Sequence, residues 1–402
     1  MIEFKELISD DFSKKMPLKY YPRKLRIKVK KEFETPVRAV IDSEYKNKMN
    51  FPNQIKLPDS ISIDVQYFNR EKLQSFLNEN GAMKKLKDNV YQFSKSATDS
   101  YLSILSLRQQ KKSQWPELNE KQFCRFMRFL DIVQSGINTK SMPELSLNFE
   151  YKTAVQQFCK QHQESNPIVW VDLRENNNFV FKKKIDLLKE LVKNQVLQVI
   201  GFYAGNMNVM DKYNVNLDYL YNELGQEEVL LVYEGSYKSF TAPHTGVSKL
   251  HYQPFEVFDV ISPYRFPRGG EGKTKSSIDR AKNCSFLDKD DVSLKKFGEI
   301  GKDKVEFYLN YLDAKSRITL KEITDKIEVS KGIDKGEALI FTSFANTQQV
   351  IAGDDEMKEI SKRIGGGETY DYLEEKKALE KEVKRRLSIE NGNVMDFFEQ
   401  DE

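Results

Sequence analysis

Apolar runs that alternate with amphipathic segments dominate the middle of the chain. The apolar positions recur at helical spacing in 151–163, 181–194 and 216–224, and continuous apolar runs follow at 168–173, 196–205 and 228–235. Continuous apolar runs are typical of strands covered on both faces. Their alternation with helices predicts parallel strands joined by helical crossovers.

Further apolar segments extend this pattern towards both ends of the chain. Short strands are predicted at 37–42, 60–68 and 254–259, whereas residues 84–135 are predicted to be helical. The sequence therefore predicts an α/β protein built as a TIM-like (β/α)8 barrel with insertions. A doubly wound open sheet is the competing architecture.

The pattern divides the chain into four parts. We expect a basic N-terminal strand or arm over 1–35, the barrel over 36–291, a mostly helical C-terminal region over 292–390 and a tail over 391–402. Within the C-terminal region the pattern predicts helices at 303–312, 319–329 and 374–387, a strand at 337–345 and a glycine hinge at 365–367.

Composition narrows the class of protein. The chain has 402 residues, of which 39% are hydrophobic and 31% charged, and its mean hydropathy is −0.63. We expect a cytoplasmic protein with no membrane partner, because no long apolar run is present and acids stand near the first residue. Cys124, Cys159 and Cys284 show no C-x-x-C spacing, which argues against a disulfide framework and an all-cysteine zinc site.

The N-terminal part carries a periodic basic segment. Leu25, Ile27 and Val29 alternate with basic residues that include Arg26 and Lys28. A strand with this pattern buries one face and presents a row of cations on the other, which suits a phosphate backbone. A solvated edge strand protected by its lysines is the alternative interpretation.

Carboxylates stand at or near the predicted strand ends, where a barrel of this kind carries its reactive groups. They are Asp42, Asp64, Asp172, Glu234 and Asp259. A carboxylate can attack a sugar C1′ and displace a base, while a second one transfers protons to the departing base and from the arriving base. That chemistry requires two acids to face each other across one pocket.

The segment 258–270, FDVISPYRFPRGG, resembles a motif of the tRNA-guanine transglycosylase superfamily, F-D-x-V-x-P-T-R-x-x-R-x-G. This superfamily includes enzymes that place 7-deazaguanines in DNA. Residues 40–43, VIDS, are similar to the start of a second family motif, T-D-S-G-G-F-Q.

The resemblance implies a role for each matching residue. Asp259 would be the nucleophile, and Asp42 would act as general base and hold the incoming heterocycle. Residues of the base pocket would be Ser43, Asp172, Tyr203 and Gly205, and Arg265 and Arg268 would hold the nucleic acid. Apart from the resemblance, we expect Lys273 and the basic residues Arg26 and Lys28 to bind phosphates.

Some family features are missing. Only Cys284 stands in the region of the family's zinc ligands and no histidine follows His251, so we expect neither the structural zinc nor another cofactor. Glu44 and Tyr45 replace the Gly-Gly of the second motif.

The substrates are inferred from the resemblance and from the tail. Its pattern Asn391-x-x-Val394-x-x-Phe397-Phe398 resembles a sliding-clamp-binding peptide, which favours DNA over tRNA as substrate. The second substrate would be a free 7-deazaguanine base. Two alternatives are a non-catalytic, nucleic-acid-binding partner subunit and a metal-dependent nuclease that uses Asp42, Asp172 and Glu234.

Overall fold

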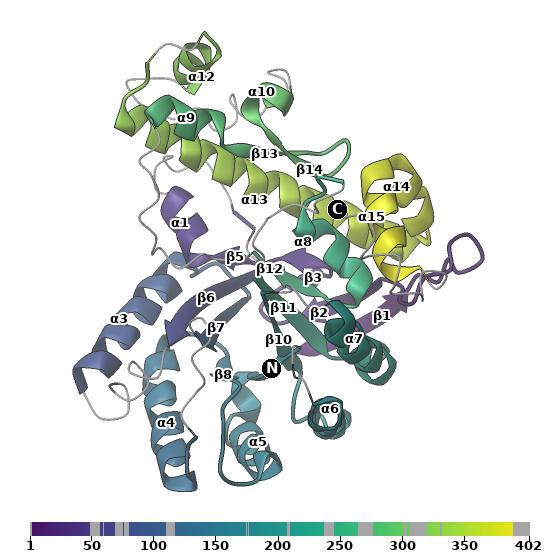
Figure 1. Ribbon diagram of the computed structural model, residues 1–402. Coiled ribbons are helices and arrows are strands. Elements are labelled where there is room, and N and C mark those ends of the chain that lie inside the picture. The colour runs from purple at the N-terminus through teal and green to yellow at the C-terminus, as the bar shows by residue number, and fades with distance from the viewer. Residues whose placement is uncertain are drawn as a thin grey trace.

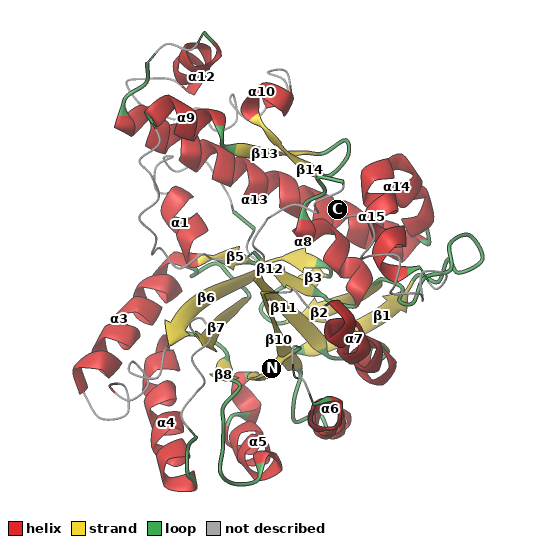
Figure 2. Ribbon diagram, viewed as in Figure 1, coloured by secondary structure: helices red, strands yellow, loops and turns green. Residues whose placement is uncertain are grey.

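A computed structural model shows an α/β protein whose strands form the centre of the molecule, with most helices around them (Figures 1 and 2). The structure describes residues 2–48, 57–58, 60–68, 75, 80–109, 117–173, 175, 177–206, 210–236, 245–263, 276–300, 304–305, 320–329 and 332–388.

The central strands form two parallel sheets. The larger has six strands in the order β4-β12-β11-β10-β9-β8, and the smaller has three in the order β5-β6-β7. Their bounds are β4 Val37–Arg38, β5 Val40–Ile41, β6 Ile61–Phe68, β7 Leu102–Gln109, β8 Lys140–Met142, β9 Pro167–Asp172, β10 Val199–Asn206, β11 Leu230–Ser236 and β12 Val260–Ser262. The predicted parallel strands at 168–173, 196–205 and 228–235 are confirmed as β9, β10 and β11.

The two sheets share one apolar interior cluster. Val37, Ile63, Ile104, Val199 and Val232, from both sheets, belong to one buried cluster. On one side, β4 and β5 are consecutive segments separated by a single residue. On the other side, side chains connect the sheets.

This seam between β7 and β8 depends on two polar side chains. The Ser103 N–H donates to Asn138 Oδ1 over 2.7 Å, and the Thr139 hydroxyl donates to the Ser103 carbonyl over 2.6 Å. Both are side-chain to backbone bonds, whereas the neighbouring strands within each sheet are joined by backbone ladders. The seam therefore lacks the regular pairing of the other strands in the described part of the chain.

Amphipathic helices cover the outer faces of the strands (Figure 1). They are α1 Asp42–Lys48, α3 Asn80–Ser96, α4 Glu120–Val133, α5 Tyr151–Gln161, α6 Asn178–Lys193 and α7 Met210–Leu224. Phe126, Phe158, Phe181 and Leu220 on these helices are buried in a second apolar cluster, together with Val171 from the outer face of β9. Burial on both faces explains why these strands are apolar along their whole length.

A separate antiparallel sheet packs against the amino ends of the parallel strands. It consists of β1 Glu3–Ser9, β2 Arg23–Lys28 and β3 Glu32–Glu34. Leu25 and Ile27 of β2 are fully buried in the interior cluster of the parallel strands, as the alternating pattern predicted. The N-terminal segment thus closes this end of the interior.

A 32-residue helix, α13 Lys335–Gly366, runs along one side of the molecule beside β13 and α9 (Figure 1). Asp334 and Glu337 form a capping box at its start, and Gly367, with φ 69°, ends it. The predicted strand at 337–345 is therefore wrong, because this apolar run is the buried part of a helix. The glycines at 365–367 form the helix end rather than a hinge.

The remaining elements lie around α13 (Figure 1). They are α8 Lys249–Tyr252, α9 Ser277–Lys282, β13 Ser285–Asp288, β14 Ser293–Lys296, α10 Phe297–Ile300, α12 Leu320–Glu328, α14 Thr369–Glu375 and α15 Lys377–Leu387. The predicted Glu380–Lys384 ion pair on the charged helix is confirmed at 2.8 Å. None of the helices in the described ranges is long and apolar enough to cross a membrane.

His251 of α8 is buried beside α13 and beside Arg38 of β4. It is 1% exposed, and burial together with the Arg38 and Lys376 charges lowers its pKa to about 3. The unfolded chain would bind this proton near pH 6.5, so between about pH 6.5 and 3 the unfolded state holds more protons. The group therefore contributes stability at neutral pH that is lost as the pH falls through this window.

Replacing His251 by Phe should flatten this dependence. We expect the free energy of unfolding of the unmodified protein to fall by up to about 1.4 kcal/mol per pH unit more than that of His251→Phe below pH 6. Urea titrations at pH 8, 6 and 5 measure it. The pH 8 comparison isolates the packing cost, and parallel curves for the two proteins would contradict the assignment.

Candidate functional site

The carboxyl ends of the parallel strands bring polar side chains into one row. Asp172 of β9 is level with Tyr203 of β10, Tyr203 with Glu234 of β11, and Glu234 with Ser262 of β12. These residues follow Trp170, Val232 and Val260 at a spacing of two, so they are on the interior face of the strands. With about 4.8 Å between neighbouring strands, the Cα atoms of Asp172 and Glu234 are about 10 Å apart.

Two hydrogen bonds from this row cross the interior to β7. The Ser106 hydroxyl donates to the Glu234 carboxylate, and the Tyr203 hydroxyl donates to the Leu107 carbonyl over 2.6 Å. Glu234 is 1% exposed, whereas Asp172 is partly exposed. The row therefore combines one deeply buried and one more accessible carboxylate.

An aromatic stack joins Tyr203 of this row to Trp170, two residues before Asp172 on β9. The Trp170 and Tyr203 rings are parallel within 10°, with their centroids 4.8 Å apart. Trp170 is level with Gly201 on β10, where any side chain would place its Cβ within 2.3 Å of the indole. Glycine at 201 is thus what allows the indole to lie there.

A polar network holds the end of β9. The Asp172 N–H donates to Glu144 Oε2 over 3.0 Å, and Glu144 and Glu175 both pair with Lys184 of α6. Burial raises the pKa of Glu144, and the Lys184 ammonium group opposes that shift. Asn216 of α7 donates to the Leu173 carbonyl over 2.8 Å, so the position of Asp172 is fixed from both flanking helices.

Asp42 lies at the same end of the strands. It is the first residue of α1, directly after β5, and is 8% exposed. Ser43 follows it on α1 and is partly buried. The Glu44 carboxylate accepts bonds from Arg38 and from the Ile41 N–H, which fixes the turn between β5 and α1.

Asp259 lies at the opposite end, which corrects the prediction of a strand that ends in this residue. Residues 253–256 form a short 3-10 helix, Val257 has φ 83°, and β12 begins only after Asp259. Ile261 pairs with Arg38, so Asp259 and Asp42 are six residues apart along the strand direction. At about 3.3 Å per residue that separation is about 20 Å, and the structure does not bring the two acids together.

The Asp259 side chain belongs to a buried ion pair. Arg23 Nε and Nη2 donate to its two carboxylate oxygens over 3.0 and 2.5 Å, and the Leu231 N–H donates over 2.8 Å. The carboxylate is fully buried. Burial raises the pKa of Asp259, and the Arg23 guanidinium opposes the shift. A fully buried carboxylate held by an arginine at the amino end of the strands has the geometry of a stabilising group, which argues against a nucleophile.

The predicted strand with a row of cations is β2, in the antiparallel sheet at this same amino end. Arg26 and Lys28 are exposed, as the alternation predicted, but Arg26 pairs with Glu6 over 3.4 Å and with Glu34 over 3.1 Å. Acids on the two neighbouring strands thus offset its charge. β2 and Asp172 are at opposite ends of the parallel strands, so the structure does not place Arg26 and Lys28 beside the carboxyl-end row.

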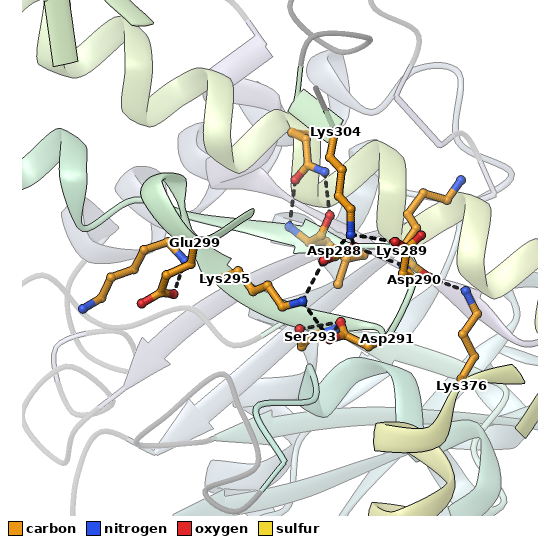
Figure 3. A network of polar contacts seen from close by, with 12 residues as sticks. Asp288, Lys289, Asp290, Asp291, Ser293, Lys295, Glu299, Lys304 and Lys376 are labelled. Carbon is orange, nitrogen blue, oxygen red and sulfur yellow. Dashed lines mark hydrogen bonds and ion pairs between the residues drawn. The ribbon is translucent and has the colours of Figure 1, made fainter. Parts of the chain in front are cut away.

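The acids Asp288, Asp290 and Asp291 lie on the hairpin of β13 and β14 (Figure 3). Asp288 is 2% exposed and accepts hydrogen bonds from Lys295 over 2.7 Å and from Lys304 over 2.8 Å. Burial favours a higher pKa for Asp288, but these lysine hydrogen bonds outweigh it and hold the pKa below its usual value. Lys376 donates to the Lys289 carbonyl, so the network joins the hairpin to the C-terminal helices.

Several predicted residues fall elsewhere. Asp64 lies inside β6 rather than at its end, and the Gln66 amide donates to it. Gly205 is in β10, opposite Gly235 and beyond a register shift after Tyr203. Outside the described residues lie Arg265, Arg268, Lys273, Val394, Phe397 and Phe398.

The described residues contain no group of three or more His, Cys, Asp or Glu side chains arranged to hold a metal ion. Cys159 and Cys284 are buried free thiols, and Cys124 is an exposed one. Asp172 and Glu234 were recognised in the sequence as strand-end acids. Ser106, Trp170 and Glu144 were not, because their contacts join segments far apart in the chain.

No protein-family model matches the chain, and no curated protein matches it significantly.

Proposed function

We propose that the two parallel sheets form one closed (β/α)8 barrel. The shared interior cluster, the continuous β4–β5 segment and the side-chain bonds between β7 and β8 support closure. The bonds from Glu234 and Tyr203 to β7 span this interior. Reactive groups of such barrels belong at the carboxyl ends of the strands.

We propose further that the protein exchanges guanine in nucleic acid for a 7-deazaguanine base, with Asp172 and Glu234 as its reactive carboxylates. The observation that carries this proposal is the row of Asp172, Tyr203 and Glu234 at one strand end. The row supplies two carboxylates about 10 Å apart by Cα, with an aromatic ring between them. The resemblance supplies the reaction class. The burial of Asp259 in an ion pair with Arg23 supports Asp172 in place of Asp259 as the nucleophile.

In this mechanism the more accessible Asp172 attacks C1′, forming an ester as the bond from C1′ to guanine N9 breaks. Glu234 gives a proton to the departing guanine, which leaves with the bonding electron pair. The incoming base returns a proton to Glu234, and its N9 then displaces Asp172 from C1′. Asp42, at the rim of the same end, would hold the incoming heterocycle.

We favour DNA as the nucleic acid, because the tail resembles a sliding-clamp-binding peptide and because the zinc ligands of the family are missing from the sequence. The basic residues Arg265, Arg268 and Lys273 follow β12 in the sequence, and β12 ends at the same edge as the row. Cations that follow this strand in the sequence suit a phosphate backbone.

The buried ion pair of Asp259 favours a second candidate function. If the residue that matches the family nucleophile has only a structural role, the chain is a non-catalytic, nucleic-acid-binding partner of such an enzyme. Turnover distinguishes the two functions.

The test uses DNA and, separately, tRNA that carry labelled guanine. We expect the unmodified protein with a 7-deazaguanine base to release the label and to form an adduct that survives denaturation. Trypsin separates the acids of interest, because Asp172 falls in peptide 161–174, Glu234 in 213–238 and Asp259 in 250–265. The adduct mass should appear on peptide 161–174. An adduct on 250–265 would contradict our reassignment, and no release from either nucleic acid would support the non-catalytic function.

A further inference from the structure

The indole N–H of Trp170 is a buried donor for which the described part of the chain offers no acceptor. The side chain is fully buried, and its Nε1 has no hydrogen-bond partner among the residues that the structure describes. It lies in the interior cluster of the parallel strands, one interior row from Asp172 and Glu234 towards the amino ends. The ring stacks on Tyr203, which belongs to that row.

Such an arrangement is unfavourable unless something else binds there. A buried donor without a partner forfeits the hydrogen bond that it makes to water in the unfolded chain. Phenylalanine would fill an apolar interior without this cost, and tryptophan is normally buried where its N–H reaches an acceptor. The sequence also gives up a side chain at Gly201, whose Cβ would come within 2.3 Å of the indole. Two positions are therefore committed to placing an indole at this depth.

We propose that the Trp170 N–H binds a carbonyl oxygen of the heterocyclic base at the floor of the carboxyl-end site. The indole only donates and carries no charge, so its partner needs a lone pair on a neutral atom. Tyr203, whose ring stacks on the Trp170 indole, connects this donor to the row of Asp172 and Glu234. This inference rests on the proposed function, and it adds a specificity contact for a base with a carbonyl group.

The experiment observes the indole itself in the folded protein. Trp170 and Trp115 are the chain's two tryptophans, so an indole-15N-labelled protein gives two Nε1–H resonances and Trp115→Phe assigns them. Guanine is added to saturation, which calorimetry establishes. Adenine, a ring of the same size without the carbonyl, is the matched probe.

Guanine should move the Trp170 proton resonance downfield, and adenine should leave it near its starting position. Trp170→Phe should weaken guanine binding about tenfold, as expected for one lost hydrogen bond, and leave adenine binding unchanged. Guanine binding with an unmoved Trp170 resonance would overturn this inference and leave the proposed function intact. Failure of guanine and 7-deazaguanine to bind at all would overturn both. A resonance that is already downfield without base and stays there would show that water occupies the donor, which also overturns the inference.

Discussion

Replacing Arg23 by Met is expected to lower the free energy of unfolding by about 3–5 kcal/mol, because it leaves the buried Asp259 carboxylate without its countercharge. Arg23 also donates to the carbonyls of Leu224, Gly225, Glu227 and Val229. Methionine fills similar space but satisfies none of these acceptors. Urea unfolding at pH 7 measures the loss.

Arg26→Met is the matched control, because Arg26 lies on the same strand but is 45% exposed. Its loss should change stability by less than about 0.5 kcal/mol. The double variant Arg23→Met, Asp259→Leu should regain much of what Arg23→Met loses, since it removes the uncompensated charge. Equal stability of Arg23→Met and the unmodified protein would show that the pair does not hold the amino end together.

Asp172→Asn and Glu234→Gln are each expected to lower base exchange by roughly 100- to 10,000-fold, the range for loss of a group that transfers protons or attacks in the transition state. Both variants keep the shape of the side chain. The label-release assay gives the rate. The two losses should differ in kind, because Asp172→Asn removes the covalent adduct, whereas Glu234→Gln slows both its formation and its breakdown.

Asp186→Asn controls for the general effect of removing a carboxylate, because Asp186 is exposed on the outer helix α6. It should leave the exchange rate within about twofold of the unmodified protein, as surface substitutions away from a site do. If Asp172→Asn retained full exchange while Asp259→Asn, assayed below its unfolding temperature, lost it, the reactive role would return to Asp259.

Local pattern predicted the strands and helices of the middle of the chain. The βα alternation between residues 151 and 236 was visible because β9, β10 and β11 are apolar on both faces and the helices between them are amphipathic. The strand β7 was missed within a stretch predicted to be helical. The apolar run at 337–345 by itself predicts a strand, whereas the capping box of Asp334 and Glu337 marks the start of a helix.

The candidate site was predictable only in part, because strand register decides which acids meet. Asp172 and Glu234 follow long apolar strands, so their place at the carboxyl ends could be predicted. Asp259 follows an equally apolar segment, but Val257 adopts a positive φ and the strand starts three residues later. Arg23 pairs with Asp259, which is far away in the sequence, and Arg26 pairs with Glu34 of the neighbouring strand. The pattern of a single sequence does not predict either pair.

The junction between β7 and β8 is held differently from the junctions between strands of the same sheet. Within each sheet the neighbouring strands share a backbone ladder, whereas this junction depends on hydrogen bonds between Ser103 of β7 and the side chains of Asn138 and Thr139. Local opening of the structure should therefore concentrate at this junction, because side-chain hydrogen bonds rather than a backbone ladder hold it. Leu107 and Ser106 on β7 are hydrogen-bonded to Tyr203 and Glu234, so such opening would also displace the residues of the reactive row.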